Sequence, residues 1–258
     1  MYNYKIKFTK KPGADEIGDE AVLEMIENYQ STLSNNGQII GGYDVFSDNG
    51  SIFFAVVLPE DDALSDAYCN DYVKKYRKKL DEFFDSELIR VGDNLEYYEP
   101  CACEKPSWYY LWSSAHDESP LFCGECRRSV PLYKIPYRED EKEHYSITSW
   151  QNAYGNMSGL WIHSLWDRFT GGQIFKHDSK LNVEGRELCA DYEKKLCVPV
   201  YYYMDYHSGA WIGARKVPAV CPQCGGAWLD DSEFVRCEKC RLLADSPEWI
   251  KKKKSQNE

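Results

Sequence analysis

The segment Asp48-Asn-Gly-Ser-Ile-Phe-Phe-Ala-Val-Val-Leu58 decides how the N-terminal third of the chain folds. Its Asn-Gly pair is the combination that two-residue hairpin turns prefer. The run that follows, Ile52–Leu58, has the length and the β-branched and aromatic content of a strand. It is far shorter than the roughly 20 apolar residues of a membrane-spanning helix. The segment therefore predicts a hairpin, with a preceding strand over residues 39–46.

Outward from this hairpin, the spacing of apolar residues predicts four more elements. Residues 2–8 alternate between apolar and polar side chains, which is typical of a half-buried strand. Residues 22–33 and 68–84 carry apolar side chains at helical spacing, Tyr72 among them. Residues 87–95 have the character of a last strand. The order βαββαβ predicts a ferredoxin-like domain within an α+β chain, and this fold name implies no iron–sulfur cluster.

Negative charge is concentrated in this domain, which we place at residues 1–96. The chain has 258 residues, 43% hydrophobic and 15% aromatic, enough to bury a core and to exclude wholesale disorder. Its formal net charge is −11. Residues 1–96 hold 10 basic and 19 acidic side chains, whereas residues 97–258 hold 21 and 23. Acidic residues near helix starts explain part of this excess. The charge argues against a general binder of phosphate backbones.

The chain has eleven cysteines, and we expect them to bind metal rather than to form disulfides. The N-terminus lacks the apolar core of a signal peptide, and no run is long enough to span a membrane. Both observations predict a cytoplasmic protein without membrane association. In that reducing compartment, clustered cysteines are more often metal ligands than disulfides.

The pattern Cys221-Pro-Gln-Cys224 and Cys237-Glu-Lys-Cys240 predicts a zinc ribbon over residues 217–246. Each Cys-x-x-Cys pair presents two thiolates from one tight turn, and two such pairs complete a tetrahedral Zn²⁺ site. The alternative, two unrelated buried or redox pairs, fits less well, because a redox pair normally stands alone between a strand and a helix.

A second group comprises Cys101, Cys103, Cys123 and Cys126. We expect a second four-cysteine zinc site here, with two alternatives. In the first, only the pair Cys123 and Cys126 persists, as the relic of such a site. In the second, His116 replaces one of the cysteines. Because four thiolates leave no open position for water, both zinc ions are expected to be structural. The remaining cysteines are expected to be buried core thiols: Cys69, Cys189 and Cys197.

Residues 97–250 are expected to form a zinc-binding α+β domain that ends in the ribbon. Ring-rich strands are predicted at residues 108–112 and 198–204, a short strand at 130–135, and helices near 143–165 and 182–196. The tail 251–258 is rich in lysine and is expected to be disordered. The sequence contains no HExxH, GxSxG, Walker A or GxGxxG motif, so we expect a protein that is not an enzyme.

Seven segments of the chain together form a recognisable set: Ser119–Cys126, Val130–Pro136, Ser149–Tyr154, Gly185–Cys189, Pro199–Tyr203, Cys221–Trp228 and Cys237–Leu243. This set resembles a bacterial Zn-ribbon-containing family of unknown function, for which nucleic-acid binding has been suggested. The resemblance implies the architecture and the binding of metal. The two C-terminal Cys-x-x-Cys pairs are also similar to double-CXXCG proteins, some of which are immunity proteins of bacterial toxin systems. Here the second pair continues as Cys240-Arg241, without the glycine of that motif.

The sequence is compatible with two main functions. The first is a non-enzymatic module that binds a basic protein partner, of which an immunity protein that neutralises a toxin is one form; the acidic N-terminal domain favours it. The second is nucleic-acid binding through the ribbon, where Trp228 and Phe234 are candidates for base stacking. Residues 217–246 hold three basic and five acidic side chains, which disfavours the second function. A redox or transferase enzyme is a remote third class.

Overall fold

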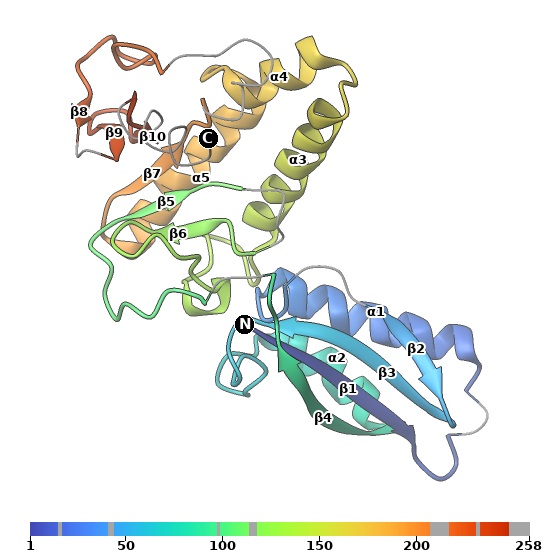
Figure 1. Cartoon of the computed structure of the whole chain (residues 1–258). Coiled ribbons are helices and arrows are strands. Elements are labelled where there is room, and N and C mark those ends of the chain that lie inside the picture. The colour runs from blue at the N-terminus through green and yellow to red at the C-terminus, as the bar shows by residue number, and fades with distance from the viewer. Residues whose placement is uncertain are drawn as a thin grey trace. The chain divides into compact units, whose positions relative to one another are not determined.

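The computed structural model describes residues 1–14, 17–40, 44–96, 99–113, 118–206, 217–230 and 233–247. The chain divides into two compact units (Figure 1). The first contains residues 1–102 together with 116–119 and 127–145, and the second contains 103–115, 120–126 and 146–258. The first unit thus includes a segment beyond the predicted boundary at residue 96. The lysine-rich tail lies outside the described residues.

The first unit contains a four-stranded antiparallel sheet with two helices on one face. The strand order is β2-β3-β1-β4, which together with the element order is the ferredoxin-like arrangement that the sequence predicts. The elements are β1 (Tyr2–Lys10), α1 (Asp19–Asn35), β2 (Val45–Asp48), β3 (Ser51–Leu58), α2 (Asp71–Asp81) and β4 (Phe84–Asp93).

Alternation along β1 creates the core of this unit. Tyr4, Ile6 and Phe8 are buried toward the helices, where they pack with residues such as Ile26 and Leu80. The predicted hairpin is confirmed, because Asp48 pairs with Ser51 across a turn whose residues Asn49 and Gly50 have φ of 48° and 78°. Positive φ at both central positions matches the twist of the flanking strands.

Three predictions for this unit need correction. The strand expected at residues 39–46 begins only at Val45, and Ile40 forms a single bridge to Val57. The last strand occupies Phe84–Asp93 rather than residues 87–95, because α2 ends three residues before it. Tyr72 lies on the exposed side of α2, since Val73 takes the buried position.

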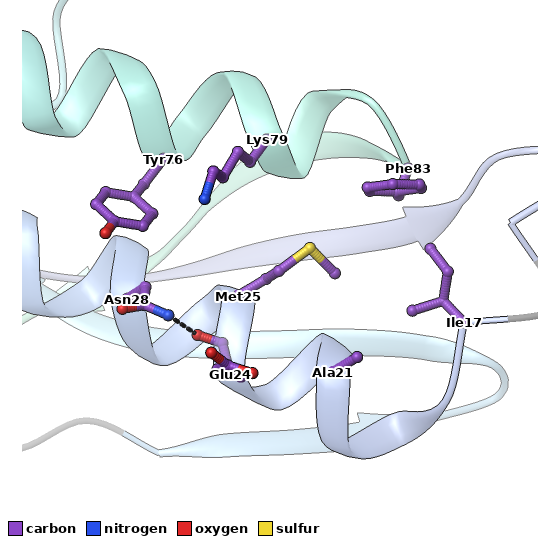
Figure 2. A pocket seen from close by; sticks show the side chains of 8 residues that line it. All are labelled: Ile17, Ala21, Glu24, Met25, Asn28, Tyr76, Lys79 and Phe83. Atoms are coloured by element: carbon purple, nitrogen blue, oxygen red, sulfur yellow. Dashed lines mark hydrogen bonds between the residues drawn. The ribbon is translucent and has the colours of Figure 1, made fainter.

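Helices α1 and α2 pack side by side on the sheet. A groove runs between them, with Ile17, Met25 and Phe83 along its floor and walls (Figure 2). Glu24 lines it from α1 and Lys79 from α2.

Residues 127–145 pack on the ferredoxin-like core of the same unit. Tyr133 joins the hydrophobic core, and its hydroxyl donates to Glu60 at 2.5 Å. Lys134 forms an ion pair with Glu60 at 2.6 Å. The predicted strand at residues 130–135 is wrong: Leu132–Lys134 form a 3₁₀ turn. Leu132 approaches Gly37 so closely that a Cβ on Gly37 would lie 2.5 Å from the Leu132 Cβ.

His144 ends this segment in a fully buried position, and its backbone N–H donates to the Asn35 carbonyl at 2.9 Å. Its ring lies 4.6 Å from that of Tyr137. Burial disfavours the charged imidazolium and lowers the pKa of His144 from 6.5 to about 4. In the unfolded chain the ring takes up a proton at the usual pKa.

The pKa of His144 predicts a loss of stability in mild acid. The unfolded chain binds the proton first, so the free energy of unfolding is largest above pH 6.5 and falls as the pH drops toward 4. The expected contribution is about 3 kcal/mol. Urea unfolding at pH 7 and pH 4.5 should show a smaller decrease for His144→Asn than for the wild type. An identical decrease in both proteins would contradict this assignment.

The second unit contains a six-stranded sheet in the order β6-β5-β7-β10-β9-β8. The C-terminal strands belong to this sheet because β10 pairs in parallel with β7. No described helix is long and apolar enough to cross a membrane. The elements are β5 (Tyr109–Leu111), β6 (Leu121–Cys123), α3 (Tyr145–Ile162), α4 (Asp167–Phe175), α5 (Lys180–Leu196), β7 (Val200–Tyr203), β8 (Leu229–Asp230), β9 (Phe234–Cys237) and β10 (Leu242–Asp245).

Successive side chains of β7 point to opposite faces of this sheet, so its tyrosine rings lie on both faces. Tyr202 is buried toward α5, and its hydroxyl donates to Asn182 at 2.6 Å. Tyr201 packs on the other face in an aromatic cluster that includes Tyr110 and Phe234. Gly185 of α5 lies against Tyr202, because a Cβ there would be 2.2 Å from the Tyr202 ring.

Two glycine substitutions test this packing, with opposite expected signs. Gly185→Ala forces the Tyr202 ring to move and should lower the free energy of unfolding by about 1–3 kcal/mol. Gly159→Ala, in α3, adds a Cβ that meets nothing within 4 Å. It should raise stability by up to about 1 kcal/mol, because alanine favours the helix. Chemical denaturation of both variants measures the difference. Stabilisation by both would contradict the close approach of α5 to β7.

Candidate metal centres

Cys221, Cys224, Cys237 and Cys240 come together in the second unit. Their Sγ atoms all lie within 4.8 Å of one another. The Sγ atoms of Cys224 and Cys237 are 3.7 Å apart. A tetrahedral Zn²⁺ with sulfur ligands at about 2.3 Å requires sulfur–sulfur distances of about 3.8 Å. The four thiols therefore fit one divalent ion.

The first Cys-x-x-Cys pair is a tight turn fixed by two backbone hydrogen bonds. The Gly225 N–H donates to the Cys221 carbonyl, and the Cys221 N–H donates to the Gly226 carbonyl, both at 2.8 Å. Gly225 has φ of 69°, a left-handed value that glycine adopts without strain. The turn points the thiols of Cys221 and Cys224 to one side.

The second pair repeats this turn with arginine in the glycine position. Arg241 has φ of 52°, which costs a residue with a Cβ about 1 kcal/mol or more. Its guanidinium donates from Nε to Glu193 of α5 at 2.9 Å and from Nη1 to Glu238 at 2.8 Å. It also lies 5.4 Å from the Tyr201 ring centroid. These contacts offset the backbone strain and attach the knuckle to α5 and β7.

The thiols of this group differ in acidity. A hydrogen bond from the Gly226 backbone lowers the pKa of Cys224 to about 7. Burial and neighbouring thiols raise the pKa of Cys240 to about 12, and burial raises that of Cys221. Four adjacent thiolates repel one another, so a divalent cation is what favours ionisation of all four.

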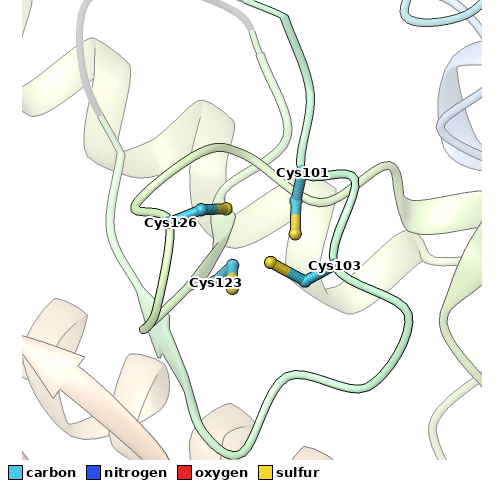
Figure 3. A group of neighbouring side chains, drawn as sticks. All are labelled: Cys101, Cys103, Cys123 and Cys126. Atoms are coloured by element: carbon cyan, nitrogen blue, oxygen red, sulfur yellow. The ribbon is translucent and has the colours of Figure 1, made fainter.

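The second group brings together the thiols of Cys101, Cys103, Cys123 and Cys126 (Figure 3). Their Sγ atoms also lie within 4.8 Å of one another. Cys101 and Cys123 are buried, and Cys103 and Cys126 are partly buried. The predicted alternative with His116 concerns a residue outside the described ranges.

Cys123 is held by the edge of the sheet. It is the last residue of β6 and pairs with Tyr109 of β5. The next residue, Gly124, donates its N–H to the Trp108 carbonyl at 2.9 Å, and a Cβ there would be 2.0 Å from the indole. Arg127, directly after Cys126, has φ of 60°. All three Cys-x-x-Cys pairs are thus followed by a left-handed residue.

The three remaining cysteines lie apart from both groups. Cys69 and Cys189 are buried, as predicted, and burial raises the pKa of Cys189. Cys197 is exposed, so the prediction of a buried core thiol is wrong for it. It ends α5 in a left-handed conformation with φ of 57°, which turns its side chain away from the core-facing stripe of the helix.

Basic and aromatic side chains near the group Cys221–Cys240 form ion pairs, hydrogen bonds or core contacts within the protein. Arg236 pairs with Glu238 at 3.0 Å, and Arg241 pairs with Glu193. Phe234 is buried in the aromatic cluster, and the Trp228 indole donates to the Pro218 carbonyl at 2.8 Å. The sequence showed these residue types but not the pairing of Arg241 with Glu193, because an ion pair between distant segments leaves no local pattern.

Comparisons with known proteins connect the chain to bacterial proteins. Residues 103–205 match the model of a domain of unknown function, DUF2310. Residues 1–88 match that of another, DUF8589. These matches support a bacterial family of unknown function. Two proteins of Haemophilus influenzae, both named "Uncharacterized protein", are 28% identical. One matches over 225 residues (81% of this chain, 85% of the relative), the other over 164 (60% and 79%).

Solved structures overlap with about a third of the chain. A crystal structure of an antibiotic biosynthesis monooxygenase is 16% identical, covering 36% of this chain and 99% of its own, with a TM-score of 0.27. The structure of Rv0793 from Mycobacterium tuberculosis is 12% identical, covering 36% and 93%, with a TM-score of 0.28.

The two groups predict two metal ions per chain, measured by elemental analysis of the purified protein. Cys103→Ser and Cys224→Ser should each lower the content to one, because each removes a ligand from a different group. Cys197→Ser is the matched control and should retain two. A wild-type content near one that Cys103→Ser leaves unchanged would remove the group at Cys101–Cys126 from the metal sites.

Proposed function

We propose that the chain is a non-enzymatic, cytoplasmic zinc protein that binds a basic protein partner, in the manner of an immunity protein that occupies a toxin. The observation that carries the proposal is that each metal centre is a closed set of four thiols. Four sulfur ligands leave Zn²⁺ no position for a water or substrate. Bound ions would then stabilise the fold, and we expect the protein to act through the binding of a partner to its surface.

Zinc is the metal that this ligand set favours. Thiolate ligands select soft or borderline ions, and tetrahedral four-sulfur geometry is typical of Zn²⁺ or of iron–sulfur centres. Paired Cys-x-x-Cys turns on short antiparallel strands are typical of zinc ribbons. Strands β8, β9 and β10 are such strands, and Cys237 ends β9.

The surface charge of the first unit favours a basic partner. Some of its acidic side chains are paired internally: Glu60 with Lys134, Asp61 with Arg90, and Asp66 with Arg77. Each of these pairs uses one acidic and one basic side chain, so the excess of acidic side chains in the unit remains available to a partner. A partner that complements this charge gains association rate and specificity.

Strand β4 is where we place the contact. It is an edge strand, and Asp85 and Glu87 are exposed on it next to exposed Asp81 and Glu82. Asp85 has one exposed ion pair, with Lys11 at 3.7 Å, and such pairs are weak. An edge strand also offers unpaired backbone groups to a partner strand.

Nucleic-acid binding by the ribbon has less support. Two of its three basic side chains, Arg236 and Arg241, are in ion pairs, and Phe234 is buried. Phosphate contacts require several available Lys or Arg side chains. Stacking on bases requires exposed rings.

Affinity purification of the tagged chain from its own host tests the proposal. The wild type should retain a basic protein in stoichiometric amount, and Asp85→Lys/Glu87→Lys should lose it. Glu184→Lys/Glu187→Lys, on the exposed side of α5, makes the same change in charge on the second unit and should retain it.

Two results would contradict the proposal. One is co-purification of ribosomal or other nucleic-acid material, together with salt-dependent binding to purified RNA or DNA. The other is a partner retained equally by both charge variants, because the contact then does not involve β4. Zinc content and circular dichroism of each variant confirm that loss of binding is not loss of folding.

A further inference from the structure

The outer faces of α1 and α2 carry opposite charges. Helix α1 has four acidic residues and no basic one, and all four are exposed: Asp19, Glu20, Glu24 and Glu27. Helix α2 has five basic residues, four of them exposed: Lys74, Lys75, Lys78 and Lys79. In the described part of the chain, no ion pair within 4.0 Å joins the two sets.

Helix dipoles explain only part of this arrangement. Acidic residues in the first turn of α1 and lysines in the last turn of α2 stabilise their own helices. That effect is limited to the terminal turns. Glu24 and Glu27 lie beyond the first turn of α1, and Lys75 lies before the last turn of α2. The helix dipoles therefore do not explain why these three residues carry opposite charges on the two helices.

The residues that line the groove show which positions of α1 and α2 lie opposite each other along the helix axes. Figure 2 shows Ile17 and Ala21 across from Phe83 at one end, and Asn28 across from Tyr76 at the other. The helices are therefore antiparallel, with Glu24 and Lys79 between those ends. The ammonium groups of Lys75 and Lys79 lie 5.3 and 5.1 Å from the Tyr76 ring centroid, at the rim of the groove.

We propose that this helical face binds a second copy of the chain about a two-fold axis that runs along the groove. Such an axis places α1 of one copy over α2 of the other, twice, as a closed two-fold interface requires. It also keeps residues at the same level along the groove. Glu24 of one copy then faces Lys79 of the second, and Glu27 faces Lys75.

Charge and apolar surface favour this occupant. A two-fold axis across the helices would place α1 on α1 and α2 on α2, bringing like charges together. The axis along the groove instead brings Glu24 and Glu27 of each copy opposite Lys79 and Lys75 of the other. It also buries the groove residues Ile17, Met25 and Phe83 of both copies around the axis, which removes apolar surface from water.

Sedimentation analysis of the full, metal-loaded chain tests the proposal by measuring dimerisation of the wild type and of variants with reversed charges. The wild type should dimerise, more weakly at high salt. Glu24→Lys/Glu27→Lys places lysines opposite Lys79 and Lys75 of the second copy, and Lys75→Glu/Lys79→Glu places glutamates opposite Glu27 and Glu24. Each should weaken dimerisation at least about tenfold, because like charges then face each other. The four substitutions combined should restore it, and an equal mixture of the two double variants should form a heterodimer.

The control is Glu184→Lys/Glu187→Lys, which changes net charge equally with Glu24→Lys/Glu27→Lys and should dimerise like the wild type. Monomeric wild type at all attainable concentrations would overturn the proposal. So would unchanged dimerisation in either double variant, or a combined variant that is folded, metal-loaded and monomeric. These readouts are independent of the partner on β4, so the two proposals can fail separately.

Discussion

The left-handed turn after each Cys-x-x-Cys pair is the constraint on which both candidate metal centres depend. Gly225, Arg127 and Arg241 all have positive φ, and each follows the second cysteine of a pair. This turn presents the two thiols of each Cys-x-x-Cys pair to one side. Because Arg127 and Arg241 carry a Cβ, their conformation costs energy that neighbouring contacts must offset. For Arg241 the contacts are with Glu193, Glu238 and Tyr201, and they attach the turn to the rest of the unit.

The two groups of cysteines act on opposite ends of one sheet. Cys123 ends the edge strand β6, and Cys237 ends β9, next to the other edge. The strands at these ends are only two to four residues long, shorter than the usual length of about five to six. A metal ion bound at each group would supply folding energy at the two ends of the sheet. Between them, Tyr202 is buried against α5 without any metal contact.

Local periodicity was enough to predict much of this molecule. The alternation of residues 2–8 and the turn at Asn49-Gly50 identify the ferredoxin-like unit, and cysteine spacing identifies all eight candidate ligands. Long-range contacts were not predictable. The parallel pairing of β10 with β7 depends on residues about forty positions apart. The segment around Leu132 reads as a strand, yet its packing against Gly37 and the core favours a 3₁₀ turn. Strand β6 is too short to show a period.

Both candidate metal centres are closed sets of four sulfur ligands, so the ions that they bind should be structural. Zinc K-edge X-ray absorption of the metal-loaded protein distinguishes a closed centre from an open one. We expect a single shell of four sulfur atoms at about 2.3 Å, averaged over two ions per chain. A nitrogen or oxygen shell at about 2.0–2.1 Å would contradict it, because a site with such a ligand is not the closed four-sulfur centre described.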